Sequence, residues 1–256
     1  MEKIDVILVK LGGSLITFKD KPLKANLKVI DSLTKIFKQI STPMIIVHGG
    51  GSFGHYYANK YGLSDKYSSL SNTGVMLTKY YMNKLNSLVV DSFIKANIPS
   101  YPIAPINMFV NDQLTNDAKD TLIYALKQGI TPITFGDVII SKDGYKILSG
   151  DKIMKLIGVN LNPIRAVFLM NVDGFYYPDF NSGNLVPKLN SETKILKKFG
   201  VNKIDVTGGI NTKLQESILL SKNGIDVSFV NGFKSDRVVK ALLGNIFKGT
   251  IIEGKK

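Results

Sequence analysis

Short apolar runs alternate along the chain with segments that have the spacing of amphipathic helices. The runs are rich in Val and Ile, which is typical of strands buried on both faces of a parallel sheet. We predict strands at 6–9, 44–47, 102–106, 131–135, 166–170, 227–230 and 250–252, and helices at 26–39, 74–96, 117–127, 151–159 and 211–222. This alternation predicts an α/β fold, a three-layer αβα sandwich with a mainly parallel central sheet.

Ligands of such folds bind at the carboxyl ends of the strands, and glycine clusters follow several of the predicted strands. The first is Lys10-Leu11-Gly12-Gly13-Ser14. Its two glycines allow a tight turn that brings backbone N–H groups close to an anion, while Lys10 adds positive charge. The cluster is therefore a candidate phosphate site, although an ordinary glycine turn has the same sequence.

The second cluster contains Gly49, Gly50 and Gly51, with a histidine on either side. Three consecutive glycines are rare in a plain connector, so we expect the backbone to approach a ligand closely. His48 abuts a strand and fits a structural histidine. His55 lies where a helix begins, and we favour a functional role for it.

Three further clusters follow later in the chain. In Ser149-Gly150-Asp151-Lys152, Asp151 fits either a helix N-cap or a functional carboxylate. The run from Asn171 to Tyr176 alone resembles a turn. In the segment from Thr207 to Lys213, a lysine stands in a first helical turn, where the helix dipole disfavours cations, which indicates a nearby anion. No Walker A loop occurs, so a different phosphate-binding fold is needed.

Composition excludes several classes of site. The chain of 256 residues has no Cys, which excludes disulfides, thiolate metal sites and a cysteine nucleophile. Its net charge of +13 comes almost entirely from scattered lysines, with Arg only at 165 and 237, and this favours a solvated surface over a nucleic-acid interface. No segment is long and apolar enough to span a membrane and no targeting segment is visible. We expect a cytoplasmic protein.

Taken in order, the five clusters resemble the amino acid kinase superfamily across nearly the whole chain. The resemblance implies one domain, 1–256, with an acceptor-binding lobe at about 1–160 and a nucleotide-binding lobe at about 161–256. It also implies ATP as the phosphoryl donor and a homodimer. The stretches 14–19 and 48–56 look like those of the isopentenyl phosphate kinases, so the implied reaction is ATP-dependent phosphorylation of isopentenyl phosphate to isopentenyl diphosphate.

The resemblance also implies roles for individual residues. His55 matches the histidine that binds the acceptor phosphate, and Asp151 matches a carboxylate that orients lysines. Lys10, Lys19 and Lys213 match lysines that contact phosphates, while Phe18 departs from the family because an acidic residue often stands there. Acceptor-side positions are matched by Gly50 and Gly150, and nucleotide-side positions by Gly12, Gly13, Ser14, Gly51, Asp173, Gly208 and Gly209.

This chemistry suits the residues themselves. Two phosphate anions must be brought together, so cations and aligned N–H donors are needed, while the attacking oxygen is already ionised and needs no general base. Carboxylates are scarce in the motifs, so we expect no protein metal site and Mg²⁺ carried mainly by ATP. Val75, Thr78 and Met82 lie on one predicted helix stripe that fits either a pocket for the acceptor's apolar tail or simply the core.

Three other functions are consistent with parts of this pattern. The first is the same fold acting on another acceptor, such as uridylate, an amino acid carboxylate or a phosphonate. The second is a non-catalytic nucleotide-binding sensor, against which the three motif lysines argue. The third is a nucleic-acid-binding module, which would bind in a salt-dependent way.

Overall fold

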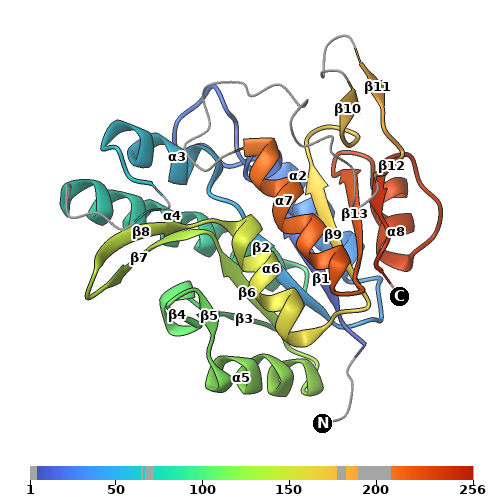
Figure 1. Cartoon of the computed structure of the whole chain (residues 1–256), viewed down its shortest axis with the longest axis horizontal. Coiled ribbons are helices and arrows are strands. Elements are labelled where there is room, and N and C mark those ends of the chain that lie inside the picture. Colours follow the sequence, from blue (N-terminus) through green and yellow to red (C-terminus); the bar gives the residue numbers. More distant parts are fainter. Residues whose placement is uncertain (1–4, 65, 67–71, 178–182, 190–208, 256) are drawn as a thin grey trace.

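The computed structural model describes residues 5–64, 66, 72–177, 183–189 and 209–255. Its centre is an eight-stranded sheet in the order β12-β14-β13-β9-β1-β2-β6-β3 (Figure 1). All neighbouring strands run parallel except β13 and β14. The strands are β1 Ile7–Leu11, β2 Met44–His48, β3 Ser100–Pro102, β6 Thr131–Phe135, β9 Arg165–Met170, β12 Lys188–Leu189, β13 Asp226–Asn231 and β14 Thr250–Ile252.

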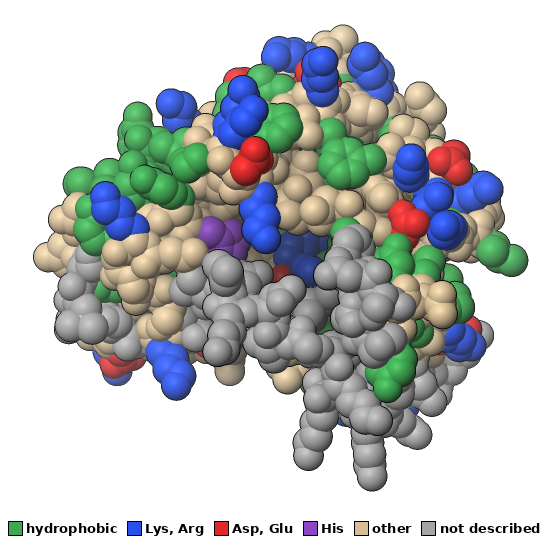
Figure 2. Space-filling view, turned by 90° about the horizontal axis from the view of Figure 1, so that it is seen from above, with side chains coloured by type: hydrophobic (Ala, Val, Ile, Leu, Met, Phe, Trp, Pro, Cys, Tyr) green, Lys and Arg blue, Asp and Glu red, His purple; other side chains and the backbone are tan. Residues whose placement is uncertain are grey.

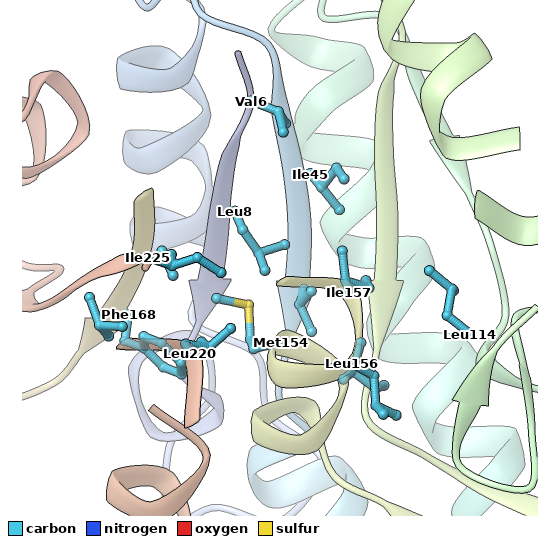
Figure 3. Close-up of a cluster of buried hydrophobic side chains, with 14 of the residues drawn as sticks. Val6, Leu8, Ile45, Leu114, Met154, Leu156, Ile157, Phe168, Leu220 and Ile225 are labelled. Carbon is cyan, nitrogen blue, oxygen red and sulfur yellow. The ribbon is translucent and has the colours of Figure 1, made fainter. Parts of the chain in front are cut away.

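The central strands are buried on both faces because side chains alternate between two cores. On β1, Leu8 belongs to one core cluster, whereas Ile7 and Val9 belong to the other. Figure 3 shows Leu8 pointing toward Met154 and Ile157 in the first cluster. This two-sided burial explains the continuous apolar runs in the sequence.

Helices cover both faces of the sheet and complete the predicted three-layer αβα sandwich (Figure 1). One face carries α5 Asn116–Lys127, α6 Gly150–Leu161 and α7 Gly209–Lys222. The other face carries α2 Leu27–Phe37, α3 Gly51–Lys60, α4 Asn72–Lys95 and α8 Ser235–Leu243. A short helix, α1 Gly13–Ile16, follows β1 directly. No helix among the described residues is both long and apolar enough to cross a membrane.

In the described part of the chain, three small hairpins lie outside the central sheet. They are β4 Phe109–Val110 with β5 Gln113–Leu114, β7 Asp137–Ser141 with β8 Gly144–Leu148, and β10 Tyr176–Tyr177 with β11 Asn184–Leu185. The sequence predicted neither these hairpins nor α8, and it placed the start of a helix near His55, where α3 already begins at Gly51. The start of α3 is rich in glycine, which has poor helix propensity, so the tertiary structure overrides the local preference there.

Six of the seven predicted strands and all five predicted helices are confirmed within a few residues. The strand expected at 102–106 is wrong. The chain leaves the sheet after Pro102, and a 3₁₀ turn, η1 Pro105–Asn107, begins at Pro105. Proline has no N–H for a sheet ladder, and its fixed φ suits the start of a helical turn.

Candidate active site

The glycine loops after β1 and β2 pack backbone against backbone at the carboxyl edge of the sheet. A Cβ atom on Gly13 would lie 2.3 Å from the amide nitrogen of Gly51, and one on Gly49 would lie 2.8 Å from the nitrogen of Gly13. Gly51 also has a φ of +47°, which disfavours any side chain. Glycine is therefore needed at these positions because the two loops touch each other. Their contact brings two sets of backbone N–H groups to one place.

The hydroxyl of Thr17 ties the two glycine loops together. Thr17 Oγ1 donates to the carbonyl oxygen of Gly13 at 2.8 Å and accepts from the amide of Ser52 at 2.9 Å. Nothing in the local sequence marked Thr17, because its role depends on a partner 35 residues away.

Two lysines from opposite ends of the chain meet on one carboxylate. Lys10 Nζ and Lys213 Nζ both contact Asp151 Oδ1, the second at 2.7 Å. Asp151 is not the N-cap of α6, because Ser149 Oγ accepts the hydrogen bond from the Lys152 amide that defines the cap. The carboxylate is thus available to hold both cations, and it is the anion expected near the first turn of α7.

Burial sets the electrostatics of this cluster. It lowers the pKa of Lys10 from its ordinary value to about 7, although the Asp151 carboxylate opposes that shift. For Asp151, burial acts to raise the pKa, but the charges of Lys10 and Lys213 outweigh it and hold the pKa well below the usual range. An anionic ligand placed beside Lys10 would favour its protonated form.

Of the two glycines that the sequence matched to acceptor positions, Gly150 borders this cluster. A Cβ on Gly150 would lie 3.2 Å from Lys10 Cε, so Gly150 leaves room for that side chain. Gly50 and Gly54 both face the Met82 sulfur, at 3.0 Å and 2.9 Å from the Cβ positions. The turn that precedes α3 therefore rests on α4.

The two histidines lie in different environments. His48 is buried, stacks on Phe135 with ring centroids 5.2 Å apart, and its Nε2 lies 3.1 Å from Asn86 Oδ1. Burial lowers its pKa to about 4, so it is a structural histidine, as predicted. His55 is half-buried in α3. Figure 2 shows a histidine at the rim of a hollow that also carries Lys or Arg side chains.

Three other predicted residues lie around this edge. Ser14 Oγ donates to Asn171 Oδ1 at 3.1 Å, which joins the β1 loop to the end of β9. Asp173 forms an ion pair of 2.8 Å with Arg237 and a longer one of 3.6 Å with Lys248. Burial acts to raise the pKa of Asp173, but the Asn231 and Arg237 hydrogen bonds outweigh it and lower that pKa. Lys19 is exposed beyond α1.

The three residues expected to line a tail pocket are all buried, but they divide between two clusters. Val75 packs with residues of α3 and the β7–β8 hairpin in a separate apolar cluster of Ala58, Leu63, Val75, Val138, Tyr145 and Ile147. Met82 belongs to the main core. Thr78 lies between them along α4, and its buried hydroxyl has no hydrogen-bond partner among the described residues.

Comparisons with known proteins agree with this geometry. The model of the amino acid kinase family matches residues 5–231. The isopentenyl phosphate kinase of Methanothermobacter thermautotrophicus is 31% identical, over 98% of this chain and its own full length. That of Thermoplasma acidophilum is 33% identical, over 96% of this chain and its own full length. This chain belongs to the amino acid kinase family. Within it, the chain groups with the isopentenyl phosphate kinases.

A solved structure extends the likeness to three dimensions. A crystal structure of an isopentenyl phosphate kinase substrate complex superposes with a TM-score of 0.82 at 27% identity, covering 98% of this chain and all of that one. The central sheet and its covering helices are thus those of the amino acid kinase fold.

At this carboxyl edge of the sheet, some residues were not predicted from the sequence, and two predicted residues lie outside the described part of the chain. Arg237, the partner of Asp173, was not predicted. Its scarcity could have pointed to it, since the chain has only two arginines. Nothing in the sequence indicated the ion pair between Lys79 and the buried Asp137. Thr207 and Gly208 lie outside the described residues, whereas Gly209 begins α7.

Proposed function

We propose that the protein transfers the γ-phosphoryl group of ATP to isopentenyl phosphate and forms isopentenyl diphosphate. The observation that carries the proposal is the meeting of Lys10 and Lys213 on Asp151, beside the paired glycine loops. Cations fixed by a shared carboxylate next to two backbone turns suit a reaction that joins two phosphate anions. The family relationship supports the same reaction.

In this mechanism an oxygen of the acceptor phosphate attacks the γ-phosphorus of ATP, the bond to the β–γ bridging oxygen breaks, and ADP leaves. Lys10 and Lys213 bind the phosphates of ATP and neutralise the charge that develops on the leaving oxygen. Asp151 accepts no proton; it orients the two ammonium groups. Because the attacking oxygen is already ionised, no general base takes part.

The remaining roles follow the same division. His55 and Lys19 bind the acceptor phosphate, with Gly50 and Gly150 leaving space beside it. On the nucleotide side, Gly12, Gly13, Ser14, Gly51 and Gly209 offer backbone and hydroxyl contacts. Asp173 acts indirectly there, because its carboxylate already pairs with Arg237.

In this proposal, the apolar tail of the acceptor binds between α3, α4 and the β7–β8 hairpin. The cluster that contains Val75, Val138 and Ile147 lies there and is separate from the main core. Thr78 and Met82 border it along α4.

Magnesium enters this proposal bound to ATP. Within the described residues no three His, Asp or Glu side chains gather as a metal site. Asp151 and Asp173 are each engaged by cationic side chains, so they fit Mg²⁺ ligation poorly. The ion would neutralise charge on the phosphates that it accompanies.

We further propose a cytoplasmic homodimer with two lobes. The acceptor lobe, about 1–160, contributes β1, β2, β6 and β3 to one half of the sheet, and the nucleotide lobe, about 161–256, contributes β9, β13, β14 and β12 to the other. This division is consistent with a reaction at the β1–β9 boundary.

A turnover assay with ATP and magnesium against a panel of acceptors tests the function. We expect kcat/KM for isopentenyl phosphate to exceed that for uridylate, for amino acid carboxylates and for phosphonates by orders of magnitude. Faster turnover of any of those acceptors, or none with isopentenyl phosphate, would refute the proposal.

A further inference from the structure

An ion pair between a partly exposed lysine and a buried carboxylate lies between α4 and the β7–β8 hairpin. Lys79 Nζ contacts Asp137 Oδ2, and the Asp137 side chain has no exposed surface. Its other oxygen, Oδ1, accepts a hydrogen bond of 2.8 Å from the Val138 amide. Asp137 is the first residue of the hairpin, so the pair joins the base of the hairpin to the helix.

Neither strand of the hairpin belongs to the central sheet, although Ile139 and Leu148 pack into the main core. The Ile147 amide donates to the Ser64 carbonyl at 2.7 Å, and Lys146 pairs with Asp112 at 2.7 Å. Among the described residues, the apolar cluster that includes Val75, Val138 and Ile147 also connects the hairpin to α4. A shift of the hairpin relative to α4 would therefore change the space between them.

The pair lies close to the proposed reaction centre. Gly136, which precedes Asp137, packs so closely that a Cβ on it would lie 2.8 Å from the Gly150 amide nitrogen. Lys79 Nζ also lies 6.0 Å from the centroid of the Phe135 ring, on which His48 stacks. Lys79 thus reaches from α4 across the carboxyl end of β6.

The burial of Asp137 opposes its charged form. Burial raises the pKa of Asp137 to about 6, and the charge of Lys79 only partly offsets this. Desolvation therefore exceeds the attraction between the charges, and such pairs are often no more stabilising than apolar side chains of similar volume. Because both carboxylate oxygens of Asp137 are engaged, the pair gives the base of the hairpin a defined position.

We infer that Lys79 and Asp137 are positioning residues that fix the β7–β8 hairpin against α4, and that they thereby limit the length of the acceptor tail. The second part rests on the proposed function. Neither residue touches the reacting phosphates; both act through the hairpin wall formed by Val138 and Ile147.

Matched variants separate this role from a general loss of structure. Lys79→Met keeps the aliphatic stem and removes the charge, Asp137→Asn keeps an acceptor for the Val138 amide, and Lys79→Arg keeps the cation. Lys188→Met is the control, since it breaks an ion pair with Glu253 in which both side chains are 62% exposed.

The first measurement is amide hydrogen exchange of residues 137–148 in the whole protein, which needs no substrate. Freeing the hairpin should speed its exchange by about tenfold in Lys79→Met and Asp137→Asn, because local opening becomes easier. Lys79→Arg and Lys188→Met should match the wild type. Unchanged exchange in both charge-removing variants would overturn the inference, as would unfolding of Lys79→Met together with wild-type exchange in Asp137→Asn.

The second measurement is the ratio of kcat/KM for geranyl phosphate to that for isopentenyl phosphate. We expect the ratio to rise about fivefold in the charge-removing variants through the acceptor KM, with the ATP KM unchanged. Equal loss of kcat with both acceptors would overturn the limit on tail length, and so would an unchanged ratio. If the wild-type protein turned over neither acceptor, the proposed function would fail, while hydrogen exchange would still decide whether the pair fixes the hairpin.

Discussion

Lys213 Nζ lies 2.7 Å from Asp151 Oδ1, although the two residues stand 62 positions apart on neighbouring helices. The same oxygen contacts Lys10 at the end of β1. One carboxylate thus fixes the relative positions of two cations, one at the end of β1 and the other on α7. The proposed phosphoryl transfer depends on this arrangement.

Removing the Lys213 ammonium should lower turnover strongly. If it stabilises charge on the transferring phosphoryl group, Lys213→Ala should reduce kcat by roughly two orders of magnitude or more. Steady-state kinetics with saturating ATP and isopentenyl phosphate measure this. Wild-type kcat in the variant would rule out the assigned role.

The pKa of Lys10 predicts that nucleotide binding takes up a proton. In the free protein burial lowers this pKa to about 7, so near pH 8 most molecules carry neutral Lys10. Bound phosphates favour the ammonium form, so ATP binding should consume protons and weaken as the pH rises above about 7. Calorimetry in two buffers of different ionisation enthalpy counts these protons. Lys10→Arg should take up none, and equal uptake by both proteins would contradict the account.

Shortening Val75 should enlarge the acceptor pocket. Val75→Ala removes methyl groups from the cluster between α3, α4 and the hairpin. Activity on longer prenyl phosphates should then improve relative to isopentenyl phosphate, since a pocket rejects an extra methylene by about 1–3 kcal/mol. Thr78→Ala and Met82→Ala are companion variants. An unchanged chain-length preference in all three would place the tail elsewhere.

His55 should act on the acceptor and not on ATP. A charge-assisted hydrogen bond to a phosphate is worth about 1.5–3 kcal/mol, so His55→Ala should lower kcat/KM for isopentenyl phosphate by at least about tenfold. His55→Gln, which keeps a donor without the charge, should fall between. His55→Ala with normal acceptor kinetics, or with lost ATP affinity, would make this histidine structural.

Much of the fold was predictable because its signals are local. The strand at Thr131–Phe135 is a continuous apolar run, and α5 shows clear helical spacing up to Lys127. The active-site cluster was predictable only through the order of its motifs, since each motif alone also fitted a turn or a cap. The amino acid kinase resemblance named Lys10, Asp151 and Lys213, and the structure brings them together.

The parts that sequence did not predict depend on distant partners. Lys79 on α4 looks like an ordinary surface lysine, and only the fold places it against Asp137, 58 residues away. The glycine loops were expected to approach a ligand, but their close packing on each other appears only when β1 and β2 lie side by side. The sequence around Asp173 did not indicate that its carboxylate pairs with Arg237.

The most direct test of the central claim follows the phosphoryl group itself. The protein is incubated with isopentenyl phosphate, magnesium and ATP labelled in its γ-phosphate, and the products are separated, with Lys213→Ala as the matched blank. The account predicts label in isopentenyl diphosphate, one equivalent for each ADP formed, and little in the blank. ADP formation without labelled isopentenyl diphosphate, or equal labelling in the blank, would contradict it.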